Sequence, residues 1–201
     1  MKNISSSTAA QTLPTSSELT SKHWTYDVFL SFSEDDRNNF IGYLYCALVK
    51  DGIRTFTDKN ALSRGGRIGD ELLNAIRGSN ISIVVFSKSY ASSRWTLEKL
   101  VEILHCIKTG NHTLLPVFYH VDPSDVRNQT GTFTEAFARY EKLIPEDMER
   151  IKRWRAALTE AANYPGWNLD SFANGYYSTL SSLVLLDEFS NWILPLFGSA
   201  R

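Results

Sequence analysis

The first group of residues that could do chemistry is a run of three carboxylates, Glu34, Asp35 and Asp36, in the segment SEDDR. Magnesium prefers oxygen ligands, so this run would suit a receiver domain, which is phosphorylated on aspartate with magnesium bound nearby. Such a domain also needs an acceptor aspartate at the end of its third strand, where this chain reads FSKS (residues 86–89). The receiver hypothesis therefore lacks its phosphorylated residue, and we predict no metal site.

The second group lies in the segment SSRWTLEKLVEIL (residues 92–104), which carries the acids Glu98 and Glu102 and one lysine, Lys99. Apolar residues recur there at helical spacing, so the segment reads as an amphipathic helix whose charges lie on a solvated face. The charges matter more if one of them faces a pocket, because a fixed charge at a reacting centre decides which transition state is stabilised. Which of these three charged residues faces a pocket depends on the fold.

Other familiar kinds of site are absent from the sequence. There is neither a G-x-x-x-x-G-K-[ST] nor a G-x-G-x-x-G phosphate loop, and Gly65-Gly66 reads as a turn. No G-x-S-x-G nucleophile motif occurs. The four histidines lack the i, i+4 spacing of a zinc-binding helix. Nothing here predicts a bound cofactor.

The elements that position these residues alternate between strands and helices. Runs of apolar and β-favouring residues predict strands, and segments of helical periodicity predict the helices between and after them. This alternation predicts an α/β fold: a single flavodoxin-like, doubly wound domain with a five-stranded parallel sheet in the order 2-1-3-4-5. The strands are expected at 26–32, 53–58, 81–87, 113–119 and 166–169, and the helices at 37–50, 69–78, 92–104, 132–143 and 146–162.

In such folds, ligands bind beyond the carboxyl ends of the strands, where the strand order reverses. This rule selects the loop after the first strand, the long loop after the second, and the start of the helix after the third. The helix that carries Lys99 is therefore predicted to begin at the rim of a ligand cleft.

Composition limits the partners and the compartment. The 201 residues have a formal net charge of −1, so no global field attracts nucleic acid or an acidic membrane. Residues 1–24 form a Ser/Thr-rich arm without a secretory signal, and the apolar run in the tail (176–201) is too short to span a bilayer and reads as a docked helix. Cys46 and Cys106 read as small buried hydrophobes in a reducing compartment. We expect the cytoplasm, with the nucleus open as a second compartment.

From Tyr26 to about Leu169 the chain resembles a plant Toll/interleukin-1 receptor (TIR) domain, and we place that domain at 25–175. The matching segments keep the family's order and spacing: YDVFLSF, IRTFTDKNALSRGGRIGDELLNAI, SIVVFSKSYASSRWTLEKL, LLPVFYHVDPSDVRNQTGTF and RWRAALTEAANYPGW. The resemblance implies the TIR fold and a role in plant innate immunity. It suggests a TIR-only protein or a truncated receptor gene product.

The resemblance also implies an activity, the cleavage of the nicotinamide–ribose bond of NAD+. The departing nicotinamide leaves positive charge on the ribose, which a nearby glutamate stabilises. The family keeps this acid in the pattern W-C-L-x-E-L, and the catalytic position is Lys99 here. The first loop, LSFSEDDR, is one residue shorter than the family's L-S-F-R-G-E-D-T-R. The implied substrate-binding residues are Phe32, Ser33, Glu34 and Trp95, with Trp95 either stacked on a ring or buried in the core.

The neighbouring acids are poor substitutes on helix geometry. At about 100° per residue, Glu98 turns well away from the face of Lys99. Glu102 shares that face but lies about 4.5 Å further along the axis, where it could instead pair with Lys99 at i+3.

Two hypotheses follow from the resemblance. In the first, the chain is an active NAD+ nucleosidase, with NAD+ as substrate, whose products signal in defence. In the second, it is a catalytically impaired TIR module that acts by contact, as a homo- or hetero-oligomer with other TIR-domain proteins. The preserved loop Arg64, Gly65, Gly66, Arg67, Ile68, Gly69 and Asp70 is the candidate self-association surface.

Overall fold

The structure is a computed structural model that describes residues 23–58, 69–110, 112–169 and 193. The predicted arm (1–24) lies almost wholly outside the described residues. So do positions 64–68 of the self-association loop and, apart from Ile193, the predicted C-terminal helix.

One parallel sheet organises the described chain. Its strands follow the order β2-β1-β3-β4-β5, so the predicted fold class and strand order are confirmed. The predicted strand ends differ from the observed ones by only one or two residues. The strands are β1 (Tyr26–Ser31), β2 (Thr55–Thr57), β3 (Ser79–Phe86), β4 (Thr113–Phe118) and β5 (Trp167–Asn168).

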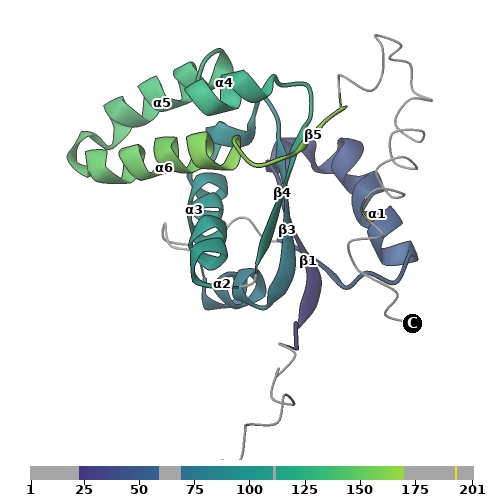
Figure 1. The fold of residues 1–201 in the computed structure, drawn as a ribbon. Coiled ribbons are helices and arrows are strands. Elements are labelled where there is room, and N and C mark those ends of the chain that lie inside the picture. The colour runs from purple at the N-terminus through teal and green to yellow at the C-terminus, as the bar shows by residue number, and fades with distance from the viewer. Residues whose placement is uncertain (1–22, 59–68, 111, 170–192, 194–201) are drawn as a thin grey trace, which may run out of the picture.

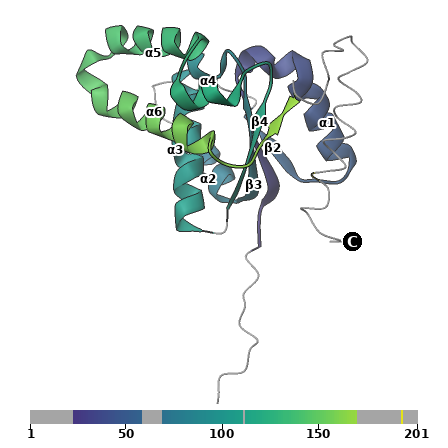
Figure 2. The same ribbon diagram turned by 45° about the horizontal axis from the view of Figure 1, so that its top comes forward.

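Helices cover both faces of the sheet. Helix α1 lies on one face, and α2 and α3 lie on the other, with α5 and α6 extending together beyond α3 (Figures 1 and 2). Short 3₁₀ turns stand at Glu34–Asp36, Tyr90–Ser92 and Pro145–Asp147, and a π-helical turn at Arg37–Ile41 leads into α1. The helices are α1 (Gly42–Lys50), α2 (Asp70–Arg77), α3 (Arg94–Thr109), α4 (Pro123–Asn128), α5 (Thr132–Leu143) and α6 (Met148–Ala161).

Alternating strand residues feed two separate cores. In β3, Ile81, Ile83 and Val85 pack under α1, and Val84 and Phe86 pack toward α3. Because both faces are covered, most residues of these strands are apolar, which is why they appear in the sequence as nearly continuous apolar runs. Ile193, from the far end of the chain, is fully buried in the α1-side core.

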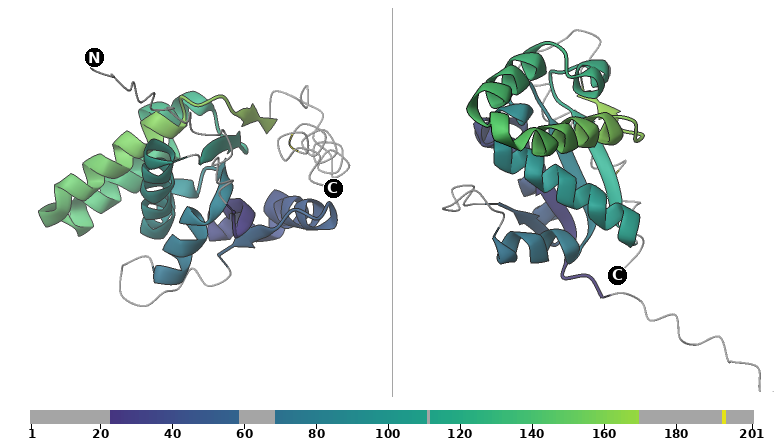
Figure 3. Two further views of the ribbon diagram at one scale, coloured as in Figure 1. Left: turned by 60° about the horizontal axis from the view of Figure 1, so that its bottom comes forward. Right: turned by 90° about the vertical axis from the view of Figure 1, so that its left-hand side faces the viewer.

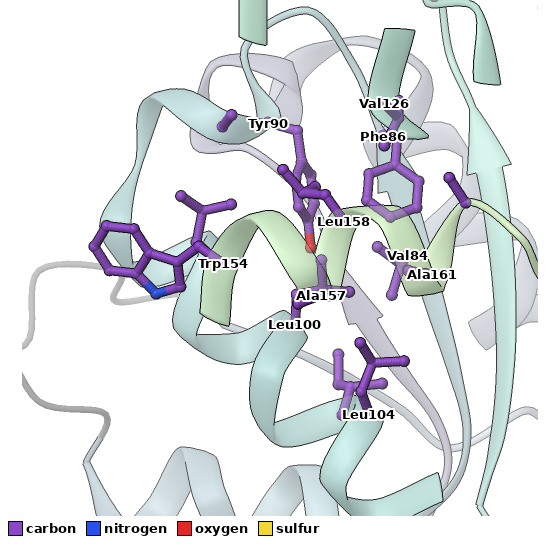
Figure 4. Close-up of a cluster of buried hydrophobic side chains, with 14 of the residues drawn as sticks. Val84, Phe86, Tyr90, Leu100, Leu104, Val126, Trp154, Ala157, Leu158 and Ala161 are labelled. Atoms are coloured by element: carbon purple, nitrogen blue, oxygen red, sulfur yellow. The ribbon is translucent and has the colours of Figure 1, made fainter. Parts of the chain in front are cut away.

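The start of α3 is held by a second packing layer. Figure 4 shows Leu158 and Ala161 of α6 gathered with Leu100 and Leu104 of α3 in this core. On the same side, the Tyr140 hydroxyl of α5 donates a 2.8 Å hydrogen bond to the carbonyl oxygen of Ala91, in the turn before α3. These contacts therefore tie α3 and the turn before it to α5 and α6, the green helices of Figure 3.

Two further sequence predictions can be compared with the structure. Cys106 is buried as expected, but Cys46 is exposed, because it lies on the outward face of α1 and not on the face that carries Leu44 and Leu48. Within the described ranges, no helix combines the length and hydropathy needed to cross a membrane.

Candidate functional site

Lys99 lies at the carboxyl end of the sheet with its side chain turned inward. It is in the second turn of α3, and only 5% of its side chain is exposed. Its Nζ atom lies 3.9 Å from Oδ2 of Asp58, which directly follows β2. A helix and a strand end thus bring together a cation and an anion that are 41 residues apart in the chain.

The loop after β1 supplies the remaining charges. Arg37 donates to both carboxylate oxygens of Glu34, with 2.7 Å for the bond from Nη2, and it also donates to the backbone carbonyl oxygen of Asp58. Its guanidinium carbon lies 5.0 Å from the ring centroid of Phe32, which is buried. We call Glu34, Arg37, Asp58 and Lys99 the charged cluster. It holds two cations and two anions, so its formal charges cancel.

Burial sets the electrostatics of this cluster. It lowers the pKa of Lys99, since a charged amine loses its hydration there, and the carboxylates of Asp58 and Glu34 only partly oppose that effect. Arg37 lowers the pKa of Lys99 further by like-charge repulsion. The pKa of Arg37 itself is raised, chiefly by its hydrogen bond to Glu34. The cluster therefore places a desolvated amine at the position that the sequence analysis predicts to be the catalytic one.

The two neighbouring acids point elsewhere. Oε1 of Glu98 lies 2.9 Å from Nε of Arg150 on α6, and Oε1 of Glu102 accepts a 2.7 Å hydrogen bond from Nε of Arg77 on α2. The pairing of Lys99 with Glu102 suggested by the i+3 spacing is wrong, because Asp58 attracts the lysine inward and Arg77 attracts the glutamate outward. Neither acid lies at the charged cluster.

Asp36 fastens the first loop to the end of β3. Its Oδ2 atom accepts hydrogen bonds from the hydroxyls of Ser87, at 2.5 Å, and Ser89, at 3.0 Å. Its backbone N–H donates to the carbonyl oxygen of Ser33, which is itself buried. These contacts use the carboxylate that the receiver hypothesis would have given to magnesium. No group of three metal-ligating side chains occurs among the described residues.

Asp36→Ala is expected to lower the free energy of unfolding by about 1–2 kcal/mol, because two serine hydroxyls lose their charged acceptor. Urea denaturation measures the loss. Asp35→Ala, which removes an exposed carboxylate one residue earlier, is the matched control and should change stability by less than about 0.5 kcal/mol. Equal losses in the two variants would contradict a fastening role for Asp36.

The remaining predicted site residues are placed as follows. Trp95 is half-buried at the start of α3, so it is neither a core tryptophan nor fully exposed. Gly69 and Asp70 are exposed, and they form the N-cap and the first residue of α2. The rest of the self-association loop lies outside the described residues.

Sequence reasoning missed two members of the charged cluster, Asp58 and Arg37. Asp58 is the last residue of the predicted second strand, and Arg37 ends the SEDDR segment. Both therefore stand at carboxyl ends of neighbouring strands, which is where a doubly wound fold gathers its ligand-binding residues. That rule selected the loops that hold both residues, but no motif in the sequence singled out these two within them.

Comparison with known proteins identifies the family of this chain. A family model described as "TIR domain" matches residues 25–176. The chain belongs to the TIR domain family. This finding confirms the resemblance and assigns the charged cluster to the loop end of a TIR sheet.

The TIR relatives are plant resistance proteins. The chain is 56% identical over 146 residues to disease resistance protein RPV1 of Vitis rotundifolia, covering 72% of this chain and 10% of RPV1. It is 49% identical over 151 residues to TMV resistance protein N of Nicotiana glutinosa, covering 75% of this chain and 13% of that protein. The chain thus spans only a small part of the length of these relatives.

A solved structure agrees with the fold. The TIR domains of the activated Roq1 resistosome, which directly recognises the pathogen effector XopQ, superimpose with a TM-score of 0.71 at 45% identity. The match covers 81% of this chain and 99% of that one, so the two domains share essentially the whole fold.

Proposed function

We propose that this TIR domain is a signalling module of plant innate immunity that acts by contact, through self-association or association with other TIR proteins, and that its NAD+ nucleosidase activity is impaired. The observation that carries the proposal is Lys99, buried in the charged cluster at the position where the family's catalytic glutamate stands. A cation there opposes the positive charge that develops on the ribose during nicotinamide departure.

The contacts of the nearby acids support the same conclusion. An active NAD+ nucleosidase, the alternative, would need another carboxylate to take over the catalytic role. Glu98 is paired with Arg150 and Glu102 with Arg77, while Glu34 is bound by Arg37. What speaks for the alternative is the family itself and Trp95, which is only half-buried. We weigh the paired acids more heavily, because each would have to break an ion pair to act.

Two observations support a role in self-association: the complete TIR fold of the described residues and the assembly formed by a similar TIR domain. The sheet, the helices and the N-terminal turn of α2 are intact, and a TIR domain similar to this one forms part of a resistosome. We propose that residues 64–70 form the self-association surface, that other TIR-domain proteins are the partners, and that the chain acts in the cytoplasm, with the nucleus as a second compartment.

Asp70→Lys is expected to weaken self-association about tenfold, because it reverses an exposed charge at the end of the proposed surface. Sedimentation velocity of the full chain across a concentration series measures the effect. Glu149→Lys makes the same change in the first turn of α6, where the side chain is 84% exposed, and serves as the control. A natural chain that stays monomeric at every concentration and binds no other TIR domain would contradict the contact role.

A further inference from the structure

Four large apolar side chains are exposed among the described residues, and they fall into two groups. Tyr43 and Val49 lie on α1, with 53% and 46% of their surface exposed. Leu143 and Met148, at 67% and 40%, lie where α5 is followed by α6. Single exposed apolar residues need no explanation, but all four of these are gathered at two places. This grouping indicates two surfaces that a partner covers.

The first group extends along the outward side of α1. Cys46 is also exposed and lies three residues from both Tyr43 and Val49, so these side chains are successive neighbours on the helix surface. Leu44 and Leu48, by contrast, are buried in the core beneath the helix. We call Tyr43, Cys46 and Val49 the α1 stripe, a surface of α1 that the core does not use.

The second group stands at the far end of the α5–α6 pair. Leu143 ends α5, the turn Pro145–Asp147 follows, and Met148 begins α6. Ile144 packs against the core, and the carboxylate of Asp147 caps the N-terminus of α6. We call Leu143 and Met148 the hairpin tip. Contacts within the chain thus hold the turn that presents this tip.

The two surfaces lie on opposite sides of the molecule. Helix α1 covers one face of the sheet, whereas the α5–α6 pair extends away beyond the other face, and Figures 1, 2 and 3 agree on this separation. One chain therefore cannot bring its own tip onto its own stripe, but two copies can. Such a contact is heterologous, because each copy keeps one surface uncovered for a further copy.

The charged residues beside the two surfaces are complementary. Lys50 and Asp51 follow the stripe at the end of α1, and Lys142 and Glu146 flank the tip. None of the four forms an ion pair within the described part of the chain. Each surface thus offers one cation and one anion, and these can pair crosswise around an apolar contact.

We propose that the hairpin tip of one copy packs on the α1 stripe of a second copy, which gives an open head-to-tail assembly. A single kind of contact then covers all four exposed apolar side chains, whereas a tip-to-tip or stripe-to-stripe dimer leaves one surface bare. The contact rests on the self-association proposed above but uses none of residues 64–70. Both surfaces are small, so the contact belongs to the weak class of interfaces, with a Kd of about 10⁻⁴ M.

Sedimentation velocity of the full chain, at concentrations up to about 0.5 mM, tests the contact. Every variant carries Asp70→Lys, which weakens the surface at residues 64–70, so the remaining association reports on tip and stripe. Leu143→Asp in the tip and Tyr43→Asp in the stripe should each weaken this association at least about tenfold, because each places a carboxylate in the apolar contact. Ala138→Asp, at an exposed position of α5 before the turn, is the matched control and should change nothing.

Mixing the two variants gives the deciding readout. Equimolar Leu143→Asp and Tyr43→Asp should form dimers that grow no further, because each supplies the surface that the other lacks. Misfolded chains could not restore association in this way. Four results would each overturn the proposal: no restoration on mixing, no effect of Tyr43→Asp, no effect of Leu143→Asp, or equal weakening by Ala138→Asp. In each case the effect of Asp70→Lys on the natural chain still tests the proposed function separately.

Discussion

Asp58→Ala is expected to lower the free energy of unfolding at neutral pH by about 2 kcal/mol, because it leaves the Lys99 ammonium buried without its nearest anion. Removal of one partner from a fully buried ion pair typically costs about 3–5 kcal/mol. The smaller value follows from the 3.9 Å separation and from the 16% of the Asp58 side chain that still reaches solvent. Arg37 also keeps its bond to the Asp58 backbone in this variant, so the loop contact persists.

Lys99→Met is the variant to compare with Asp58→Ala. Methionine keeps the length and most of the volume of lysine but needs no hydration, and Asp58 can take its hydration from solvent. Stability at neutral pH should therefore stay within about 1 kcal/mol of the natural chain or increase. Urea denaturation compares the two variants. A loss in Lys99→Met as large as that in Asp58→Ala would mean that the ammonium is not the destabilising group.

The same pair has a pH dependence of definite sign. The pKa of Lys99 is lowered by burial from 10.5, so in the alkaline window below 10.5 the unfolded chain binds more protons than the folded one. Stability that depends on this group therefore rises with pH through that window. Any advantage of Lys99→Met over the natural chain should shrink between neutral pH and about pH 10. An advantage that grows with pH would contradict the burial of a charged amine.

The sheet could be predicted because its physical causes are local. β3 and β4 are buried on both faces and so read as apolar runs, and the helices between them show the 3.6-residue repeat. The strand order followed from the general preference of doubly wound folds, and the structure bears it out. The short helix α4 is not among the predicted helices, although Asp122 caps its N-terminus by accepting from the backbone N–H of Ser124 and Pro123 opens it. Asp-Pro before a polar run is a recognisable helix start.

The candidate site could be predicted only in part. Helix periodicity locates Lys99 on α3, but it does not reveal which side chain meets it from another strand. Asp58 and Arg37 reach the lysine through tertiary contacts across the sheet end, so no local spacing encodes them. Likewise, the i+3 spacing proposed Glu102 as the partner of Lys99, whereas Arg77 on the neighbouring helix α2 binds that glutamate. In both cases a side chain from another helix or strand, and not a neighbour on α3, is the ion-pair partner.

The second large effect concerns catalysis. Lys99→Glu is expected to increase NAD+ cleavage by about 10²-fold or more over the natural chain, the factor by which one well-placed electrostatic group typically changes a rate. The introduced carboxylate would lie beside Arg37, which can hold its charge, at the proposed catalytic position. Glu98→Gln and Glu102→Gln serve as controls in the natural background, and neither should alter the rate. If Lys99→Glu also fails to cleave NAD+, the shortened first loop is the remaining defect.

The measurement that tests the central claim most directly is NAD+ consumption by the purified natural chain at high protein concentration. Nicotinamide release is followed by chromatography beside a protein-free blank. The account predicts no release above the blank, because the catalytic position holds a buried lysine and both neighbouring acids are engaged by arginines on other helices. Sustained nicotinamide release by the natural chain above the blank would contradict it, and its loss in Glu98→Gln or Glu102→Gln would identify the acid that acts.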